Sequence, residues 1–132
     1  MLLLIVNNSI LIIDRLEELI SESRINTTIH KAFSYEDTIK LLGENLYDAV
    51  LMDIDLPGNN LLSLLHEIKT SSLGTCVILF FSHIDSYSVE KYRSMGVDYF
   101  YDKHYDFEKI CDLLRDMAEV KDIQIAGRRF RK

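Results

Sequence analysis

A chain of 132 residues has room for one domain with a hydrophobic core, and 48% hydrophobic with 27% charged residues excludes a disordered chain. The charge is uneven: residues 1–120 carry 10 Lys and Arg against 20 Asp and Glu, a net charge of −10, whereas residues 121–132 carry five basic residues and one acid, a net charge of +4. Because phosphate contacts need lysine and arginine, the acidic body argues against direct binding of nucleic acid.

Five apolar runs predict five short strands. The first lies within residues 1–6, far shorter than the roughly 20 residues that span a bilayer, and no basic stretch precedes it as in a secretory signal. The third and fourth runs are continuously apolar, which is typical of parallel strands covered on both faces. The expected strands are Leu2–Val6, Thr27–Phe33, Ala49–Met52, Cys76–Phe81 and Tyr99–Tyr101.

Helical patterns lie between and after these strands. Ser34, followed three residues later by Asp37, predicts the capped start of the second helix, and Gly43 is expected to end it. The last helix is expected from about Asp106 through Val120. Apolar residues repeat at helical spacing in the first, third and last helices: Ile12, Leu16, Leu19 and Ile20; Leu61, Leu65 and Ile68; Phe107, Ile110, Leu113, Leu114 and Met117.

Residues 121–132 are expected to form a basic tail or the start of a linker after a domain that covers residues 1–120. The tail contains Arg128, Arg129, Arg131 and Lys132, and three interpretations stay open: a solvated linker or helix end, a binding arm, or the start of an output domain. The cysteines Cys76 and Cys111 have no metal-binding spacing, which indicates reduced thiols and a cytoplasmic location.

Strand and helix alternate five times, which predicts an α/β fold with helices on both faces of a doubly wound parallel sheet. In such sheets functional groups gather beyond the carboxyl ends of the strands. The residues at these ends are Asn7 and Asn8, Asp53, Ser82, and Lys103. A carboxylate can attack phosphorus, while hydroxyl and ammonium groups bind the transferred oxygens, so together these residues indicate a phosphoryl site. Each alone is explained as well by a cap, a turn or a solvated side chain.

Three stretches resemble the response-regulator receiver family of two-component signalling. Tyr47–Gly58 (YDAVLMDIDLPG) is similar to the family's phosphoacceptor strand and its Pro-Gly loop. Val77–Ser82 is similar to the fourth strand with its terminal hydroxyl residue, and Gly96–Lys103 (GVDYFYDK) to the fifth strand with its lysine. The likeness covers residues 1 to about 120. It implies a flavodoxin-like (βα)5 fold with strand order 2-1-3-4-5.

The resemblance also implies the roles of individual residues. Asp53 would accept a phosphoryl group from a partner histidine kinase or phosphotransfer protein with Mg²⁺ bound, and Ser82 and Lys103 would complete the catalytic set. Phe100 would be the aromatic residue that rearranges with Ser82. Such a domain is a switch and not an enzyme, beyond self-catalysed transfer to Asp53.

The chain departs from the family where receivers normally hold Mg²⁺ with two acidic residues, because Asn7 and Asn8 stand there. An asparagine carbonyl can coordinate Mg²⁺ but brings no charge, and one charge pair at ~4 Å is worth about 4 kcal/mol at an effective dielectric near 20. We therefore expect a weakened site formed by Asn8, Asp53 and Asp55, with Asn7 nearby. A role of Asp55 in shaping the turn beside Pro57-Gly58 is equally open.

Two histidines also depart from the family. His83 follows Ser82, where a small residue is usual, and would either restrict access or bind the phosphoryl group. His104 replaces a proline that usually follows the lysine. We expect a trans peptide bond before it, since a cis bond to another residue costs roughly 2.5–4 kcal/mol, and a somewhat different aim of Lys103. Both histidines with Asp53 and Asp55 could form a transition-metal site, although half-exposed polar residues are the simpler interpretation.

Other α/β families share parts of this pattern. The Asp53-x-Asp55 pair resembles haloacid dehalogenase phosphohydrolases, which place it after the first strand, and toprim domains, which need an early Glu. A flavodoxin needs a phosphate-binding loop after the first strand, where Asn7 and Asn8 stand. Within the receivers, a phosphorylated switch and a phosphorylation-independent pseudo-receiver that binds proteins both remain.

The expected partner surface, by the resemblance, is the fourth helix, the fifth strand and the fifth helix. It would serve a possible homodimer, and it includes Tyr87, Tyr92, Phe100 and Tyr101, which packing alone would also explain. We expect no membrane contact. Nucleic acid would be bound only through an output domain that this chain does not contain.

Overall fold

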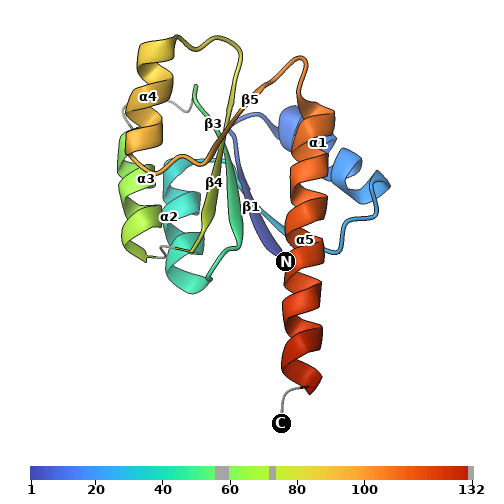
Figure 1. Cartoon of the computed structure of the whole chain (residues 1–132). Coiled ribbons are helices and arrows are strands. Elements are labelled where there is room, and N and C mark those ends of the chain that lie inside the picture. Colours follow the sequence, from blue (N-terminus) through green and yellow to red (C-terminus); the bar gives the residue numbers. More distant parts are fainter. Residues whose placement is uncertain (56–59, 72–73, 131–132) are drawn as a thin grey trace.

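The computed structural model describes residues 1–55, 60–71 and 74–130, in which strands and helices alternate along the chain. The strands are β1 (Leu2–Val6), β2 (Thr28–Ala32), β3 (Ala49–Asp53), β4 (Cys76–Phe81) and β5 (Tyr99–Asp102). The helices are α1 (Ile10–Glu22), α2 (Tyr35–Glu44), α3 (Asn60–Ser71), α4 (Ser86–Ser94) and α5 (Phe107–Phe130). All five strands pair in parallel in the order β2-β1-β3-β4-β5, which confirms the predicted fold (Figure 1).

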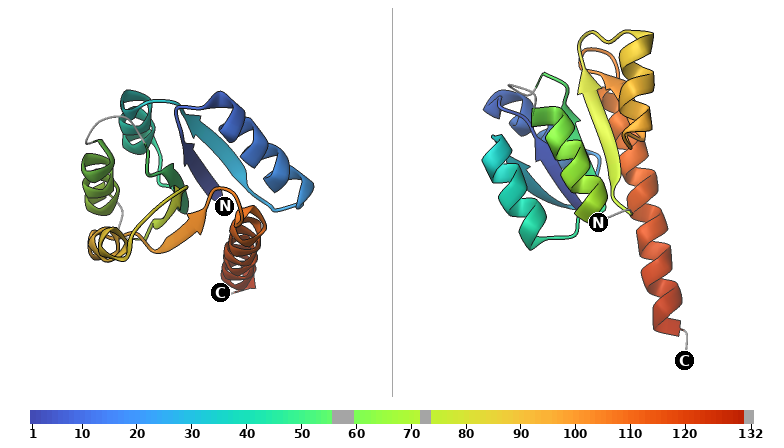
Figure 2. Two further views of the ribbon diagram at one scale, coloured as in Figure 1. Left: turned by 90° about the horizontal axis from the view of Figure 1, so that it is seen from above. Right: turned by 90° about the vertical axis from the view of Figure 1, so that its left-hand side faces the viewer.

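The sheet lies between two layers of helices. Helices α1 and α5 cover one face, and α2, α3 and α4 cover the other (Figures 1 and 2). Each face has its own core cluster, because successive residues of a strand point to opposite sides. Every residue of β3 and the four inner residues of β4 are buried, as their continuously apolar sequences predicted.

The capped start of α2 is confirmed, but its predicted end is wrong. The Ser34 hydroxyl accepts the Asp37 N–H at 3.1 Å. Gly43 lies inside the helix, which continues to Glu44. The N–H and the side-chain amide of Asn45 each donate to the Leu41 carbonyl at 3.1 Å, and this satisfies the helix end without a left-handed glycine.

The expected end of the last helix at Val120 is also wrong, since α5 continues to Phe130 and extends past the sheet (Figure 2, right). The Lys121 ammonium lies 2.7 Å from the Asp48 carboxylate, and the Asn26 amide donates to Asp122 at 3.2 Å. These contacts hold the helix to the lower end of the domain where no core lies beneath it. Of the basic tail, Arg131 and Lys132 lie outside the described residues, and a boundary at residue 120 stays a prediction.

Candidate functional site

Asp53 ends β3 at the carboxyl edge of the sheet and is only 4% exposed. The Ile54 N–H donates to the Phe80 carbonyl at 2.9 Å, which continues the pairing with β4 for one residue. The chain then turns over the carboxylate, and the Asp55 N–H donates to Asp53 Oδ1 at 2.8 Å. Strand pairing and this turn together fix the position of the acid.

Lys103 follows β5 and meets Asp53 across the sheet edge. Its Nζ lies 2.7 Å from Asp53 Oδ2 and 3.0 Å from Asp55 Oδ2, so one ammonium bridges both carboxylates. Burial disfavours the ammonium, but hydrogen bonds and attraction from Asp53 and Asp55 outweigh this and raise the pKa of Lys103 above 10.5. The lysine therefore stays charged at neutral pH.

Asn7 places an amide donor against the same carboxylate. Its Nδ2 donates to Asp53 Oδ2 at 2.9 Å, and the side chain is only 2% exposed. Its Oδ1 accepts the Ser9 N–H at 2.8 Å, so the nitrogen of the amide faces Asp53 and the oxygen faces away. Asn8, the next residue, is exposed. Of the two asparagines at this edge, the structure brings Asn7 against Asp53 through a donor, which the sequence did not indicate.

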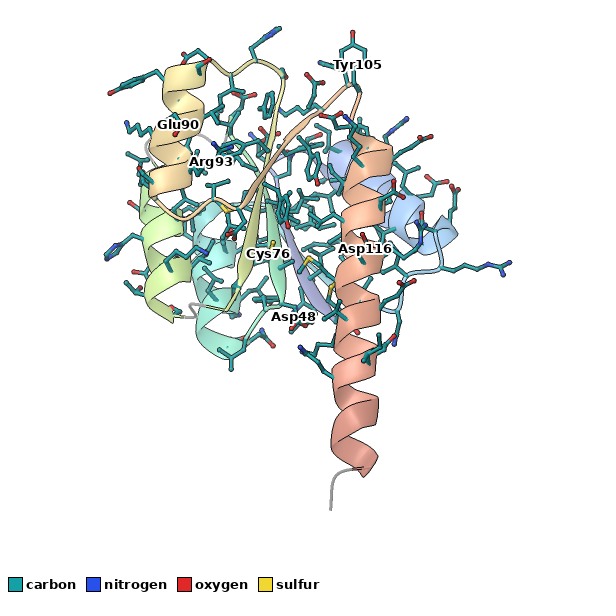
Figure 3. The ribbon with its side chains drawn as sticks, in the orientation of Figure 1. Asp48, Cys76, Glu90, Arg93, Tyr105 and Asp116 are labelled. Carbon is teal, nitrogen blue, oxygen red and sulfur yellow. The ribbon has the colours of Figure 1, made fainter. Side chains whose placement is uncertain are left out.

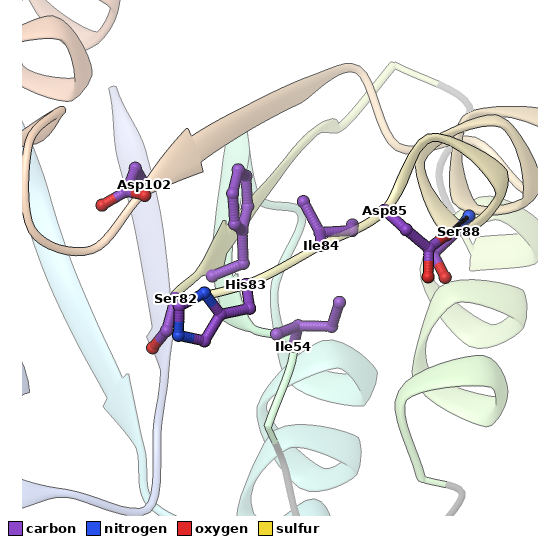
Figure 4. Close-up of a pocket in the computed structure, with 8 residues that line it drawn as sticks. Ile54, Ser82, His83, Ile84, Asp85, Ser88 and Asp102 are labelled. Carbon is purple, nitrogen blue, oxygen red and sulfur yellow. Dashed lines mark hydrogen bonds between the residues drawn. The ribbon is translucent and has the colours of Figure 1, made fainter.

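Ser82 and His83 follow β4 and lie near Ile54, the residue after Asp53 (Figure 4). Both line a cavity of about 580 Å³ with the further lining residues Ile54, Phe81, Ile84, Asp85, Ser88 and Asp102. Among the described residues, no hydrogen bond joins Ser82 to Asp53, whereas Lys103 is in contact with that carboxylate. The structure thus brings Asp53 and Lys103 together and leaves Ser82 on the same edge without a bond to them.

Phe100 lies on β5 and faces the layer that contains α4. It is half-buried and packs against the core cluster on that side of the sheet. The Arg93 guanidinium lies over the Phe100 ring, 5.6 Å from its centroid, and pairs with Glu90 at 3.0 Å; both charged residues are on α4 (Figure 3). The predicted switch aromatic therefore contacts the helix whose surface it would control.

The carboxylates of Asp53 and Asp55 are the hard oxygen donors that Mg²⁺ accepts, and both already contact the Lys103 ammonium. The donor set fits a weak cation site in which Lys103 competes with the metal. Within residues 1–55, 60–71 and 74–130, no group of three or more His, Cys, Asp or Glu residues could hold a metal ion, so His83 and His104 form no transition-metal site there.

The sequence did not single out Asp102 and Asp106, whose side chains bond to the backbone on either side of Lys103. Their signal was the pattern Asp-Lys-x-x-Asp ahead of a helix, because aspartate favours such turns and caps. The described residues contain no cis peptide bond, as expected for the bond before His104. Cys76 and Cys111 are free thiols, and no described helix is long and apolar enough to cross a membrane.

The chain is similar to proteins of known family. The family model described as "Response regulator receiver domain" matches residues 3–115. The transcriptional regulatory protein MalR of Bacillus subtilis (strain 168) is 30% identical over 93 residues, which cover 70% of this chain and 39% of that protein. The chain spans 39–50% of the length of the curated relatives that it matches.

Solved structures share the fold. A signal receiver domain from the DNA binding response regulator protein merR of Colwellia psychrerythraea 34H has a TM-score of 0.81 at 20% identity, covering 89% of this chain and 98% of that one. The BeF3-activated DrrB receiver domain has a TM-score of 0.77 at 21% identity, covering 89% and 97%. The family match replaces the phosphohydrolase, toprim and flavodoxin interpretations. The chain belongs to the response regulator receiver domain family of two-component systems.

Proposed function

We propose that Asp53 is the phosphoacceptor of this receiver domain and takes a phosphoryl group from a histidine kinase or a phosphotransfer protein. The observation that carries the proposal is the buried Asp53 carboxylate with the Lys103 ammonium 2.7 Å away. An Asp53 oxygen forms a bond to phosphorus while the bond from phosphorus to the donor's imidazole nitrogen breaks, and that imidazole takes up a proton. Beyond accepting its own phosphoryl group, the domain is a switch and not an enzyme.

Lys103 and Ser82 would bind the transferred group. Lys103 already contacts Asp53 and Asp55, so after transfer its ammonium can contact a negatively charged phosphoryl oxygen. Ser82 lines the neighbouring cavity, and its hydroxyl makes no hydrogen bond within the described part of the chain, which leaves it available to another phosphoryl oxygen. Phe100 would then rearrange together with Ser82. The contact between Phe100 and Arg93 would connect this rearrangement to α4.

Asp53, Asp55 and Asn8 would hold Mg²⁺ weakly. When bound, the ion would offset negative charge on the phosphoryl group during transfer. Asn7 is not proposed as a ligand, because its oxygen accepts the Ser9 N–H and its nitrogen faces Asp53. Lys103 supplies a permanent positive charge between the same two carboxylates, and this supports transfer with a low dependence on the metal.

We also propose that two copies pair through the surface of α4, β5 and α5. Tyr87 on α4 is 80% exposed and Tyr99 on the edge strand β5 is 41% exposed, and both are large apolar residues at a position open to a partner. Tyr99 and Tyr101 stack with their ring centroids 6.3 Å apart, which places two aromatic rings beside each other on this edge. Because residues 1–120 are acidic, DNA binding would require a further domain. The free thiols agree with a cytoplasmic location.

The test of phosphorylation is a mass measurement. The protein is incubated with acetyl phosphate and Mg²⁺, and intact mass is compared with that of Asp53→Asn. The wild type should gain one phosphoryl group and Asp53→Asn should gain none, while Asp112→Asn, a change to an exposed aspartate of α5, should gain it as the wild type does. The absence of a mass gain in the wild type would contradict the proposal and leave the pseudo-receiver, which the family match does not favour.

A further inference from the structure

The loop that joins β5 to α5 is fixed by two aspartate side chains. Asp102 Oδ1 accepts the His104 N–H at 2.7 Å and the Tyr105 N–H at 3.2 Å. In the opposite direction, Asp106 Oδ2 accepts the Asp102 N–H at 2.8 Å, and the Asp106 N–H donates to the Asp102 carbonyl at 3.1 Å. The two aspartates therefore hold each other across the loop, with Lys103 between them.

These bonds fix the backbone on both sides of Lys103. Its own N–H donates to the Phe81 carbonyl at 2.7 Å, which extends the pairing of β4 with β5 by one residue. The next two N–H groups are held by Asp102. A lysine side chain has many rotamers, so the direction of its backbone decides which of them reach Asp53. Asp106 supports this arrangement: its bond from the Asp102 N–H keeps the pKa of Asp106 below its usual value and keeps the acceptor charged.

The contact depends on a residue that this chain has in place of proline. His104 occupies the position after the lysine where receivers usually carry proline, and a proline has no N–H to donate. Here that N–H makes the shorter of the two bonds to Asp102. In this chain a carboxylate thus restrains the loop at the position where the proline ring does so in other receivers.

We propose that Asp102 is a positioning residue of the phosphoacceptor site: through the N–H groups of His104 and Tyr105 it directs Lys103 toward Asp53. Its effect on phosphoryl transfer rests on the proposed function, whereas its effect on the Lys103–Asp53 pair does not. Asp102 acts by geometry and not by charge, because its carboxylate bonds to backbone N–H groups while the ammonium of Lys103 contacts Asp53 and Asp55.

Three substitutions separate geometry from charge. Asp102→Ala removes the acceptor, Asp102→Asn keeps an oxygen acceptor without the charge, and Asp102→Glu keeps the charge but moves the carboxylate by one methylene. Asp112→Ala, which removes an exposed aspartate paired with Arg115 on α5, is the control for loss of an acidic group. NMR measures hydrogen exchange of the His104 and Tyr105 amides and of the Lys103 ammonium, and acetyl phosphate gives the rate of phosphorylation. Thermal melting checks the fold of each variant.

Asp102→Ala removes the acceptor and Asp102→Glu displaces it, so exchange of both amides should rise by about tenfold in each, because their hydrogen bonds are lost. Exchange of the Lys103 ammonium should rise with it, and phosphorylation should slow by about tenfold or more. In Asp102→Asn and Asp112→Ala, the exchange rates and the phosphorylation rate should stay within about threefold of the wild-type values. The proposal would be overturned if hydrogen exchange of the Lys103 ammonium were unchanged in Asp102→Glu. It would also be overturned if Asp102→Asn showed the same exchange and phosphorylation rates as Asp102→Ala. A wild type that is never phosphorylated would contradict the phosphoacceptor function alone, and the NMR measurement would still decide the role of Asp102.

Discussion

The side-chain amide of Asn7 takes a place that a carboxylate holds in the family pattern, and it bonds to Asp53 as a donor. Its Nδ2 lies 2.9 Å from Asp53 Oδ2 inside a buried site. In Asn7→Asp this attraction becomes repulsion between two carboxylates, and we expect a loss of about 2 kcal/mol of stability without metal. The melting temperature should fall by roughly 5–10 °C and should recover on addition of Mg²⁺, which both carboxylates could bind. A variant as stable as the wild type in chelator would contradict this description of the contact.

The exposed neighbour Asn8 offers a milder change at the same edge. In Asn8→Asp the new carboxylate stays in water, so we expect little effect on stability and a gain in Mg²⁺ affinity of about tenfold, from the added charge near Asp53 and Asp55. Isothermal titration calorimetry measures the affinity. Ser23→Asp, on the far end of α1, adds the same charge away from the site and should leave the affinity unchanged. Equal affinities of Asn8→Asp and wild type would show that position 8 does not reach the cation.

The sequence predicted which residues reach the site but not how they bond. Asp53 and Lys103 could be named because parallel strands end at one edge, and chain order places both there. The direction of the Asn7 amide could not be named, since the Ser9 N–H, a backbone group two residues away, decides it. For Asp102, the pattern Asp-Lys-x-x-Asp could indicate a turn but not which backbone N–H groups of the loop its carboxylate accepts. Backbone donors carry no sequence signature of their own.

At the scale of elements, Asp48 joins β1 to the far end of α5. It accepts the Leu2 N–H and the Lys121 ammonium, each at 2.7 Å, at the lower end of the sheet (Figure 3). Burial would raise the pKa of Asp48, but the hydrogen bonds from Lys121 and Leu2 outweigh it and hold this pKa below 3.8. The pair thus fixes the helix that extends past the domain.

The lowered pKa gives this contact a defined pH dependence. A carboxyl group whose pKa is lower in the folded chain stabilises it at every pH above the unfolded pKa, and the benefit is lost as the pH falls through the folded value. Unfolding in urea should therefore show wild type more stable than Asp48→Asn at pH 7, with the difference shrinking below about pH 4. Asp116→Asn, a change to an exposed residue of α5, is the control for loss of an acidic group from this helix. A difference as large at pH 3 as at pH 7 would contradict the ionic contribution.

The boundaries of elements were predictable where burial marks them. Strands β3 and β4 were found within one residue because an uninterrupted apolar run needs cover on both faces. The end of α5 was missed because its last turns pass beyond the core, where helix-favouring residues continue without apolar periodicity. Polar contacts with Asp48 and Asn26, far away in sequence, hold that segment, and a local pattern cannot reveal them.

At the scale of the whole molecule, the uneven charge bears on self-association. Residues 1–120 carry a net charge of −10, so two copies repel each other at low ionic strength, and a dimer needs a specific contact that outweighs this repulsion. In the proposed dimer the aromatic residues on α4 and β5 would supply that contact, and salt should strengthen it by screening the repulsion. Phosphorylation of Asp53 would act on this surface through Phe100 and Arg93.

Tyr87→Asp tests that surface directly. Tyr87 is 80% exposed, so the substitution should leave the fold intact, while a charge in an apolar interface should weaken dimerisation of the beryllofluoride-treated protein by at least about fivefold. The matched control is Leu46→Asp, because Leu46 is 76% exposed but lies between α2 and β3, outside the proposed surface. Sedimentation velocity over a range of concentrations gives both dissociation constants. If the treated wild type stays monomeric throughout, or if Leu46→Asp weakens the dimer as much as Tyr87→Asp, the pairing does not use this surface.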